Sequence, residues 1–85
     1  MTGKIIRFMR IKKGLKQTEL ANKLNISNST LAHYESGYRK ITLDTTKEIA
    51  EKCDFEILFI DKKTNKKYKF KDVERMNYDV RIKNK

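Results

Sequence analysis

The sequence has very little cysteine and histidine, and it lacks long apolar segments. Its single cysteine excludes an internal disulfide framework, and its single histidine excludes most metal sites built from histidine and cysteine. No apolar run approaches the roughly 18 residues of a membrane span, and residues 1–16 hold no apolar stretch long enough for a signal peptide. We therefore expect a cytoplasmic protein that uses no metal or other cofactor.

What the sequence has in excess is positive charge. Its 85 residues carry 21 lysines and arginines against 11 acids, a net charge of +10 at pH 7. A chain this short forms one small folded unit that buries only about 60% of the surface its unfolded form exposes. The positive charge predicts a polyanionic partner. It is densest in a run of lysines, which are Lys62, Lys63, Lys66, Lys67, Lys69 and Lys71.

Apolar residues recur at helical spacing through the first 54 residues and predict a compact all-α unit of four short helices. These helices are expected over residues 4–13, from Leu15 to about Asn25, over residues 28–36, and from about Leu43 to Cys53. Gly14 and Asn25 suit the left-handed backbone that ends a helix. Ser27 and Thr42 are the expected N-caps, because their hydroxyls can accept a hydrogen bond from a free amide of the first turn.

The spacing changes to that of β-strands after Asp54. Residues 55–60 are aromatic and β-branched, and Tyr68 and Phe70 alternate with lysines, so we expect a β-hairpin with a turn near Asn65. A third alternating segment is either another strand or a frayed tail; it contains Tyr78, Val80 and Ile82. The predicted fold class is thus mainly α, with a C-terminal hairpin or small sheet over residues 55–85.

The second and third predicted helices are joined by only three residues, 25–27, which forces the steep crossing of a helix-turn-helix. The surrounding pattern consists of Gln17-Thr18-Glu19-Leu20-Ala21, Leu24-Asn25-Ile26-Ser27, Thr30-Leu31, Tyr34-Glu35-Ser36-Gly37 and Arg39. From about Ile6 to Ala50 this pattern resembles the phage repressor/Cro-type, or Xre-like, helix-turn-helix DNA-binding family. The resemblance makes residues 1–54 the expected DNA-binding domain.

The resemblance implies that the helix over residues 28–36 lies in the major groove of double-stranded DNA. The positions that match base contacts are Asn28, Ser29, Thr30 and His33. The positions that match contacts to the DNA backbone are Gln17, Tyr38, Arg39 and Lys40. An Asn28 amide can donate and accept at once, which suits the edge of adenine. Plainer interpretations stay open: a solvated histidine, local hydrogen bonds at the helix start, and an ordinary solvated loop.

Two features depart from the family pattern. Lys16 stands where a serine or threonine usually caps the second helix, so that helix either starts frayed or is capped from elsewhere. A hairpin replaces the fifth helix that is common in phage repressors, so their dimer interface cannot be carried over to this chain.

We therefore expect a sequence-specific, repressor-like transcriptional regulator that binds a palindromic operator as a homodimer. Residues 55–85 are the expected dimerisation element with a basic tail, because so apolar an edge strand invites pairing with a second chain. The candidate interface residues are Phe55, Ile57, Leu58, Phe59 and Ile60. In the alternative interpretation, the hairpin covers only its own helical core.

Other functions fit parts of the sequence. An antitoxin-like chain could bind DNA with its helices and a partner protein, such as a toxin, with its hairpin. RNA binding is a further alternative, since the charge attracts any nucleic acid. An enzyme is not expected: the sequence has no carboxylate pair, nucleophile–base pair or ligand cluster at an informative spacing, so there are no candidate catalytic residues.

Overall fold

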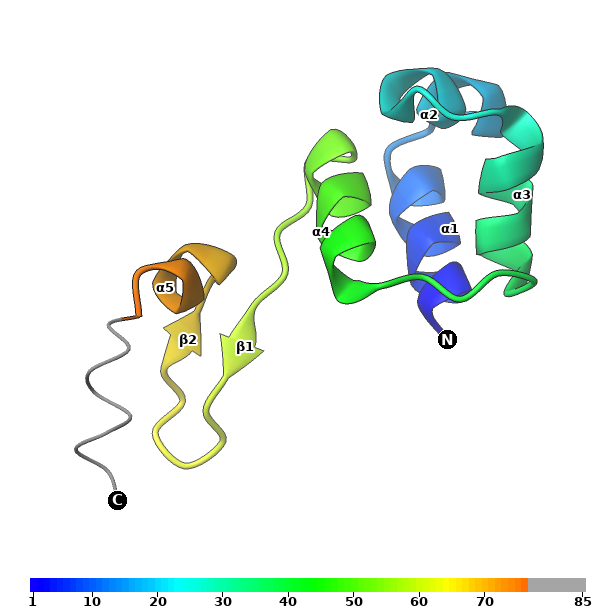
Figure 1. The fold of residues 1–85 in the computed structure, drawn as a ribbon. Helices are drawn as coiled ribbons and strands as arrows, with labels where there is room; N and C mark the ends of the chain where they lie inside the picture. Colours follow the sequence, from blue (N-terminus) through cyan, green and yellow to red (C-terminus); the bar gives the residue numbers. More distant parts are fainter. Residues whose placement is uncertain (77–85) are drawn as a thin grey trace.

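The computed structural model describes residues 1–76, which form four helices, a small hairpin and a final short helix (Figure 1). The elements are α1 (Thr2–Lys12), α2 (Gln17–Leu24), α3 (Asn28–Ser36), α4 (Leu43–Lys52), β1 (Phe59–Ile60), β2 (Lys67–Tyr68) and α5 (Phe70–Glu74). The predicted fold class, a four-helix unit followed by a β-hairpin, is confirmed. The predicted third strand, with Tyr78, Val80 and Ile82, lies outside the described residues. Of the helices described, none is long and apolar enough to cross a membrane.

Local side-chain chemistry defines where the helices start. Ser27 Oγ accepts a hydrogen bond from the Thr30 amide at 3.0 Å, and Thr42 caps α4 in the same way at 3.1 Å, as the sequence predicts. Lys16 supplies no such oxygen. Instead, the Lys16 backbone N–H donates to Glu19 Oε1 at 2.8 Å, which is one half of a capping box. The start of α2 is therefore held by the first turn of the helix itself.

The ends of α1 and α2 are also as predicted. Gly14 and Asn25 have φ angles of 68° and 56°, the left-handed conformation in which the chain leaves a helix. Asn25 lets the chain pass from α2 to α3 within three residues. This short connection is what sets the two helices at a steep angle.

The core lies where α1 and α2 pack against both α3 and α4. Its residues are at most 4% exposed, and they are Ile6, Met9, Leu20, Ala21, Leu31, Ile49, Ala50 and Cys53. Fully burying a Leu or Ile side chain stabilises a fold by about 1.5–3 kcal/mol. All eight of these residues precede Asp54, so we call residues 1–54 the helical unit.

The chain after the helical unit differs from the sequence prediction in two respects. The paired strands are only two residues each, with Phe59 opposite Tyr68 and Ile60 opposite Lys67. Phe70 does not continue the second strand but begins α5. The reason is a local cap: the Lys69 backbone N–H donates to Asp72 Oδ2 at 2.7 Å, and this hydrogen bond favours a helical turn over further strand.

We call residues 59–76 the C-terminal lobe. Its first strand reaches the helical unit through residues 55–58, and the lobe lies beyond α4, whereas α3 lies at the other end of the molecule (Figure 1). The molecule is accordingly elongated, with extents of 48 × 22 × 20 Å. Lys47 of α4 joins the two parts, since its ammonium group lies 3.8 Å from a Glu74 carboxylate oxygen and 5.1 Å from the centre of the Phe70 ring.

Candidate nucleic-acid interface

The first turn of α3 presents the residues that the sequence predicts to read DNA bases. Asn28 and Ser29 are exposed, and Thr30 is partly exposed. The Thr30 hydroxyl lies 2.8 Å from Ser27 Oγ, so it takes part in the cap at the start of the helix. Asn28 and Ser29 therefore keep their side-chain polar groups free for a ligand, while Thr30 shares its hydroxyl with the cap.

His33 lies one turn after Ser29 and is partly exposed. Its ring contacts the ring of Tyr38, with the two centres 4.8 Å apart and the planes inclined at 44°. The Tyr38 backbone N–H also donates to the His33 carbonyl oxygen at 3.0 Å. A predicted base-reading side chain and a predicted backbone contact are thus held together at the end of α3.

Tyr38, Arg39 and Lys40 are all exposed and follow directly after Gly37, where φ is 81°. The N-terminus of α1 lies beside this loop, because Gly3 packs against the last carbonyl groups of α3. A Cβ atom at Gly3 would clash with the carbonyl oxygens of Tyr34 and Glu35. The lack of a side chain at Gly3 therefore sets how closely α1 approaches the recognition end of the molecule.

Sequence reasoning missed an ion pair that ties the helices of this end together. The Arg10 guanidinium donates to both carboxylate oxygens of Glu35, at 2.7 and 2.9 Å. Their side chains are only 13% and 4% exposed. Arg10 also donates to the Leu15 carbonyl oxygen at 2.9 Å. The hydrogen bond to Glu35 is the main cause of the raised pKa of Arg10.

Gln17, a predicted phosphate contact, belongs to the same network. Its Nε2 donates to Glu35 Oε1 at 3.3 Å, and the side chain is partly exposed at the N-terminus of α2. One carboxylate on α3 thus fixes groups from α1 and α2. The sequence did contain a signal for this pair. Arg10 follows the core residue Ile6 by four positions, and Glu35 follows the core residue Leu31 by four positions, so both charges lie on buried helix faces. A charge on a buried face requires a partner.

The predicted dimerisation residues fall into two groups. Phe55 and Ile57 are partly buried and pack against the helical core. Leu58, Phe59 and Ile60 are 39%, 40% and 54% exposed. The alternative interpretation, in which this segment covers its own core, therefore applies to the first group only.

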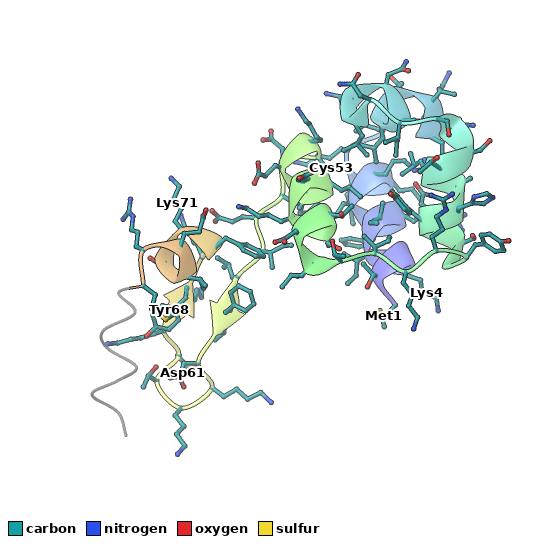
Figure 2. The ribbon with its side chains drawn as sticks, viewed as in Figure 1. Met1, Lys4, Cys53, Asp61, Tyr68 and Lys71 are labelled. Atoms are coloured by element: carbon teal, nitrogen blue, oxygen red, sulfur yellow. The ribbon has the colours of Figure 1, made fainter. Side chains whose placement is uncertain are left out.

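Two further features bear on chemistry. Cys53 is 1% exposed, between α4 and the other helices (Figure 2), and this burial raises the pKa of its thiol. Within residues 1–76, no three histidine, cysteine, aspartate or glutamate side chains lie close enough together to hold a metal ion. A surface that offers amide, imidazole, guanidinium and ammonium groups at one end suits a polyanion.

Comparison with known proteins supports the geometry. A family model described as "Helix-turn-helix" matches residues 6–60, which include α2, α3 and the connection between them. No curated protein and no solved structure matches the chain.

Proposed function

The chain belongs to the Xre/Cro-like helix-turn-helix family of DNA-binding transcriptional regulators, and from this premise we propose that it reads a palindromic operator as a homodimer. The observation that carries the proposal is the start of α3, where Asn28 and Ser29 are exposed beside the Ser27 cap, while exposed Arg39 and Lys40 follow the end of the helix. In this mode a recognition helix enters the major groove with its N-terminal residues toward the base edges.

Asn28, Ser29, Thr30 and His33 are the proposed base contacts. The free amide of Asn28 can bond in two places to adenine, a contact that contributes about 1–3 kcal/mol of discrimination. His33 reaches the groove from the next turn, and its contact with Tyr38 limits the orientations of its ring. These side chains choose the site, whereas the phosphate contacts supply much of the affinity.

Gln17, Tyr38, Arg39 and Lys40 are the proposed phosphate contacts. They lie at the start of α2 and just after α3, so they flank the reading helix on both sides along the chain. Glu35 holds the Gln17 amide group, and Arg10 holds Glu35. This arrangement fixes the register of α3 on the duplex, which is the part that phosphate contacts play in recognition.

Two copies reading one palindrome must present both α3 helices to the same side of the duplex, about 34 Å apart. Copies that lie side by side along their long axes fit within this spacing, because the short axes measure 22 and 20 Å. The two lobes then meet at the end remote from the operator. The exposed apolar side chains of Leu58, Phe59 and Ile60 are the proposed contact there, since a two-stranded hairpin alone is only marginally stable.

The decisive experiment selects bound sequences from a random duplex library and then compares Asn28→Ala with Asn22→Ala. Both asparagines are exposed, but Asn22 lies on α2. We expect Asn28→Ala to weaken binding to the selected site by about 1–3 kcal/mol and to relax preference at one base pair. Non-specific affinity and the Asn22→Ala variant should be unchanged. An equal loss on specific and non-specific duplexes would contradict base reading by Asn28.

Sedimentation at micromolar concentration tests the dimer. Ile60→Lys puts a charge on the proposed contact, and Val73→Lys is its control, since both side chains are 54% exposed. We expect the wild type and Val73→Lys to sediment as dimers and Ile60→Lys as a monomer. A monomeric wild type would contradict the proposed dimer. The proposed DNA contacts would be unaffected by this result, because the first experiment tests them separately.

A further inference from the structure

The turn of the hairpin carries positive charge that the operator-reading surface does not use. We call its four lysines, Lys62, Lys63, Lys66 and Lys67, the lysine turn. All four are exposed, and none of them makes an ion pair with a carboxylate of the described residues. Asp61 is the one acid between residues 61 and 71. The lysine turn is therefore a second cationic surface.

Hydrogen bonds hold this turn in one shape. The Asp61 N–H donates to the Lys66 carbonyl at 2.9 Å, and the Asn65 N–H donates to the Asp61 carbonyl at 2.7 Å. The Asp61 carboxylate accepts from the Lys63 N–H at 2.9 Å, so it is used within the turn. Asn65 takes the left-handed φ of 61° that closes the loop. In the closed hairpin, these hydrogen bonds bring the four lysine side chains together on one loop.

The position of the turn excludes it from the operator bound by the same copy. α3 contacts α1 and α2 on its inner side, and the lobe lies beyond α4 at the opposite end of the 48 Å axis. Asp61, at the start of the turn, lies far from α1, α2 and α3 (Figure 2). A duplex lying on the outer side of α3 is separated from the lysine turn by the whole helical unit.

We propose that the lysine turn binds the phosphate backbone of a second DNA segment, so that the operator-bound protein bridges two duplexes. This inference rests on the proposed function, because α3 must hold the first duplex. Charge complementarity identifies DNA as the ligand of the lysine turn, because lysine ammonium groups bind phosphate as point charges. A protein bound to its operator is also surrounded by other DNA segments. The second contact is independent of sequence, since point-charge contacts to phosphates carry no information about the bases.

The strength of this contact follows from counterion release. Four lysine–phosphate contacts give a slope of log affinity against log salt of about −3.6, so binding of the second duplex falls roughly 100-fold between 50 and 200 mM salt. The affinity of a single protein for a free second duplex is therefore weak. Bridging becomes effective where both segments belong to one long DNA molecule, because tethering raises the effective concentration of the second segment.

The test immobilises a short operator duplex, saturates it with protein, and measures capture of a second, labelled duplex without the operator. Lys62→Glu/Lys63→Glu is compared with Lys23→Glu/Lys52→Glu, which changes the net charge equally on exposed residues of α2 and α4. We expect the first variant to lower capture at least tenfold and the control to lower it less than threefold. Binding to the short operator should change equally in both variants.

Three outcomes of the capture measurement would overturn the proposal: no capture by the wild type, equal loss of capture in both variants, or capture that survives Lys62→Glu/Lys63→Glu. The last result would mean that a second α3, and not the lysine turn, holds the second duplex. A selective loss of short-operator affinity in the lysine-turn variant would also overturn it, because the turn would then lie on the same duplex as α3. Loss of operator binding by the wild type would refute the proposed function instead, and is measured separately.

Discussion

The helical unit and the C-terminal lobe are built on different principles. Every residue of the buried core lies in the helical unit, whereas no described residue after Cys53 is buried. In the helical unit, α2, α3 and α4 begin at local caps, and the helices are then fixed by packing on one another. The lobe has two-residue strands and one short helix, and the Phe59 and Phe70 rings meet there edge to face, with centres 5.4 Å apart. The buried contacts that stabilise the fold are thus concentrated in the helical unit, and the side chains of the C-terminal lobe are mostly exposed.

Ion pairs show the same difference. The Arg10–Glu35 pair is almost enclosed and has two hydrogen bonds. The Lys69–Glu56 pair, which joins the lobe to the segment before it, has side chains that are 54% and 59% exposed, at a distance of 3.4 Å. Exposed pairs contribute only about 0–1 kcal/mol, because water screens them. The enclosed pair therefore fixes three helical segments of the helical unit, whereas the exposed pair adds little to stability.

The largest expected effect is on the free energy of unfolding, and it should distinguish the helical unit from the C-terminal lobe. Leu31→Ala removes a side chain with no exposed surface, and we expect it to lower the free energy of unfolding by about 3 kcal/mol. Ile60→Ala, at a residue 54% exposed, should change it by less than about 0.5 kcal/mol in the monomer. Urea unfolding followed by circular dichroism measures both. Similar losses in the two variants would mean that the lobe belongs to the same cooperative core.

The second effect concerns the enclosed carboxylate. Glu35→Gln leaves the Arg10 charge without its partner, so we expect a loss of about 2–3 kcal/mol in the free energy of unfolding. It should also weaken operator binding, because the new amide has one acceptor oxygen in place of the two that Arg10 and Gln17 share. Glu74→Gln, at a side chain 66% exposed, should change stability by less than about 0.5 kcal/mol. A stability loss in Glu35→Gln without any loss of binding would show that Gln17 does not need this support.

A third effect sharpens the description of the helical unit. Gly3→Ala should lower the free energy of unfolding by about 2 kcal/mol, since the new Cβ meets backbone carbonyl groups that cannot move aside. Gly14→Ala meets no atom within 4 Å and should cost about 1 kcal/mol, from its left-handed φ alone. Thermal unfolding of the two variants distinguishes close approach from backbone strain. Gly14→Ala proving the more harmful would contradict this assignment.

The smallest effect compares one lysine from each region. Lys40→Ala should reduce the magnitude of the slope of log affinity against log salt for a short operator by about one unit. Lys66→Ala removes the same charge from the lobe and should leave the slope unchanged. Titrations at several salt concentrations give both slopes. Equal changes of slope in the two variants would mean that the lysine turn contacts the operator, and that both ends of the molecule bind the same duplex.

Most of the helical unit could be predicted from the sequence because its signals are local. Apolar spacing, the hydroxyls of Ser27 and Thr42, and the left-handed tendency of Gly14 and Asn25 each act within a few residues. The family match over residues 6–60 confirms the resemblance drawn from the helix-turn-helix pattern. The base and phosphate contacts stay predictions, as do the dimer contacts.

What could not be predicted depends on long-range contacts or on two competing local preferences. The Arg10–Glu35 pair joins residues 25 positions apart, and spacing along the chain does not say which charge meets which. Phe70 fits a strand by alternation and a helix by the Asp72 cap, and the cap together with the Phe59 contact decides for the helix. The uncapped Lys16 was an ambiguity of the same kind, resolved by Glu19.

The exposed turn between β1 and β2 also makes the molecule easy to divide. Trypsin cleaves after lysine and arginine, and Lys62, Lys63 and Lys66 stand on a hairpin held by two residue pairs, which opens at little cost in free energy. Sites inside the packed helices open only when the core does. Brief digestion should therefore cut first in this turn and release a fragment of about residues 1–63. That fragment would keep every core residue and the whole of α3, and so supply the DNA-reading part of the protein in isolation.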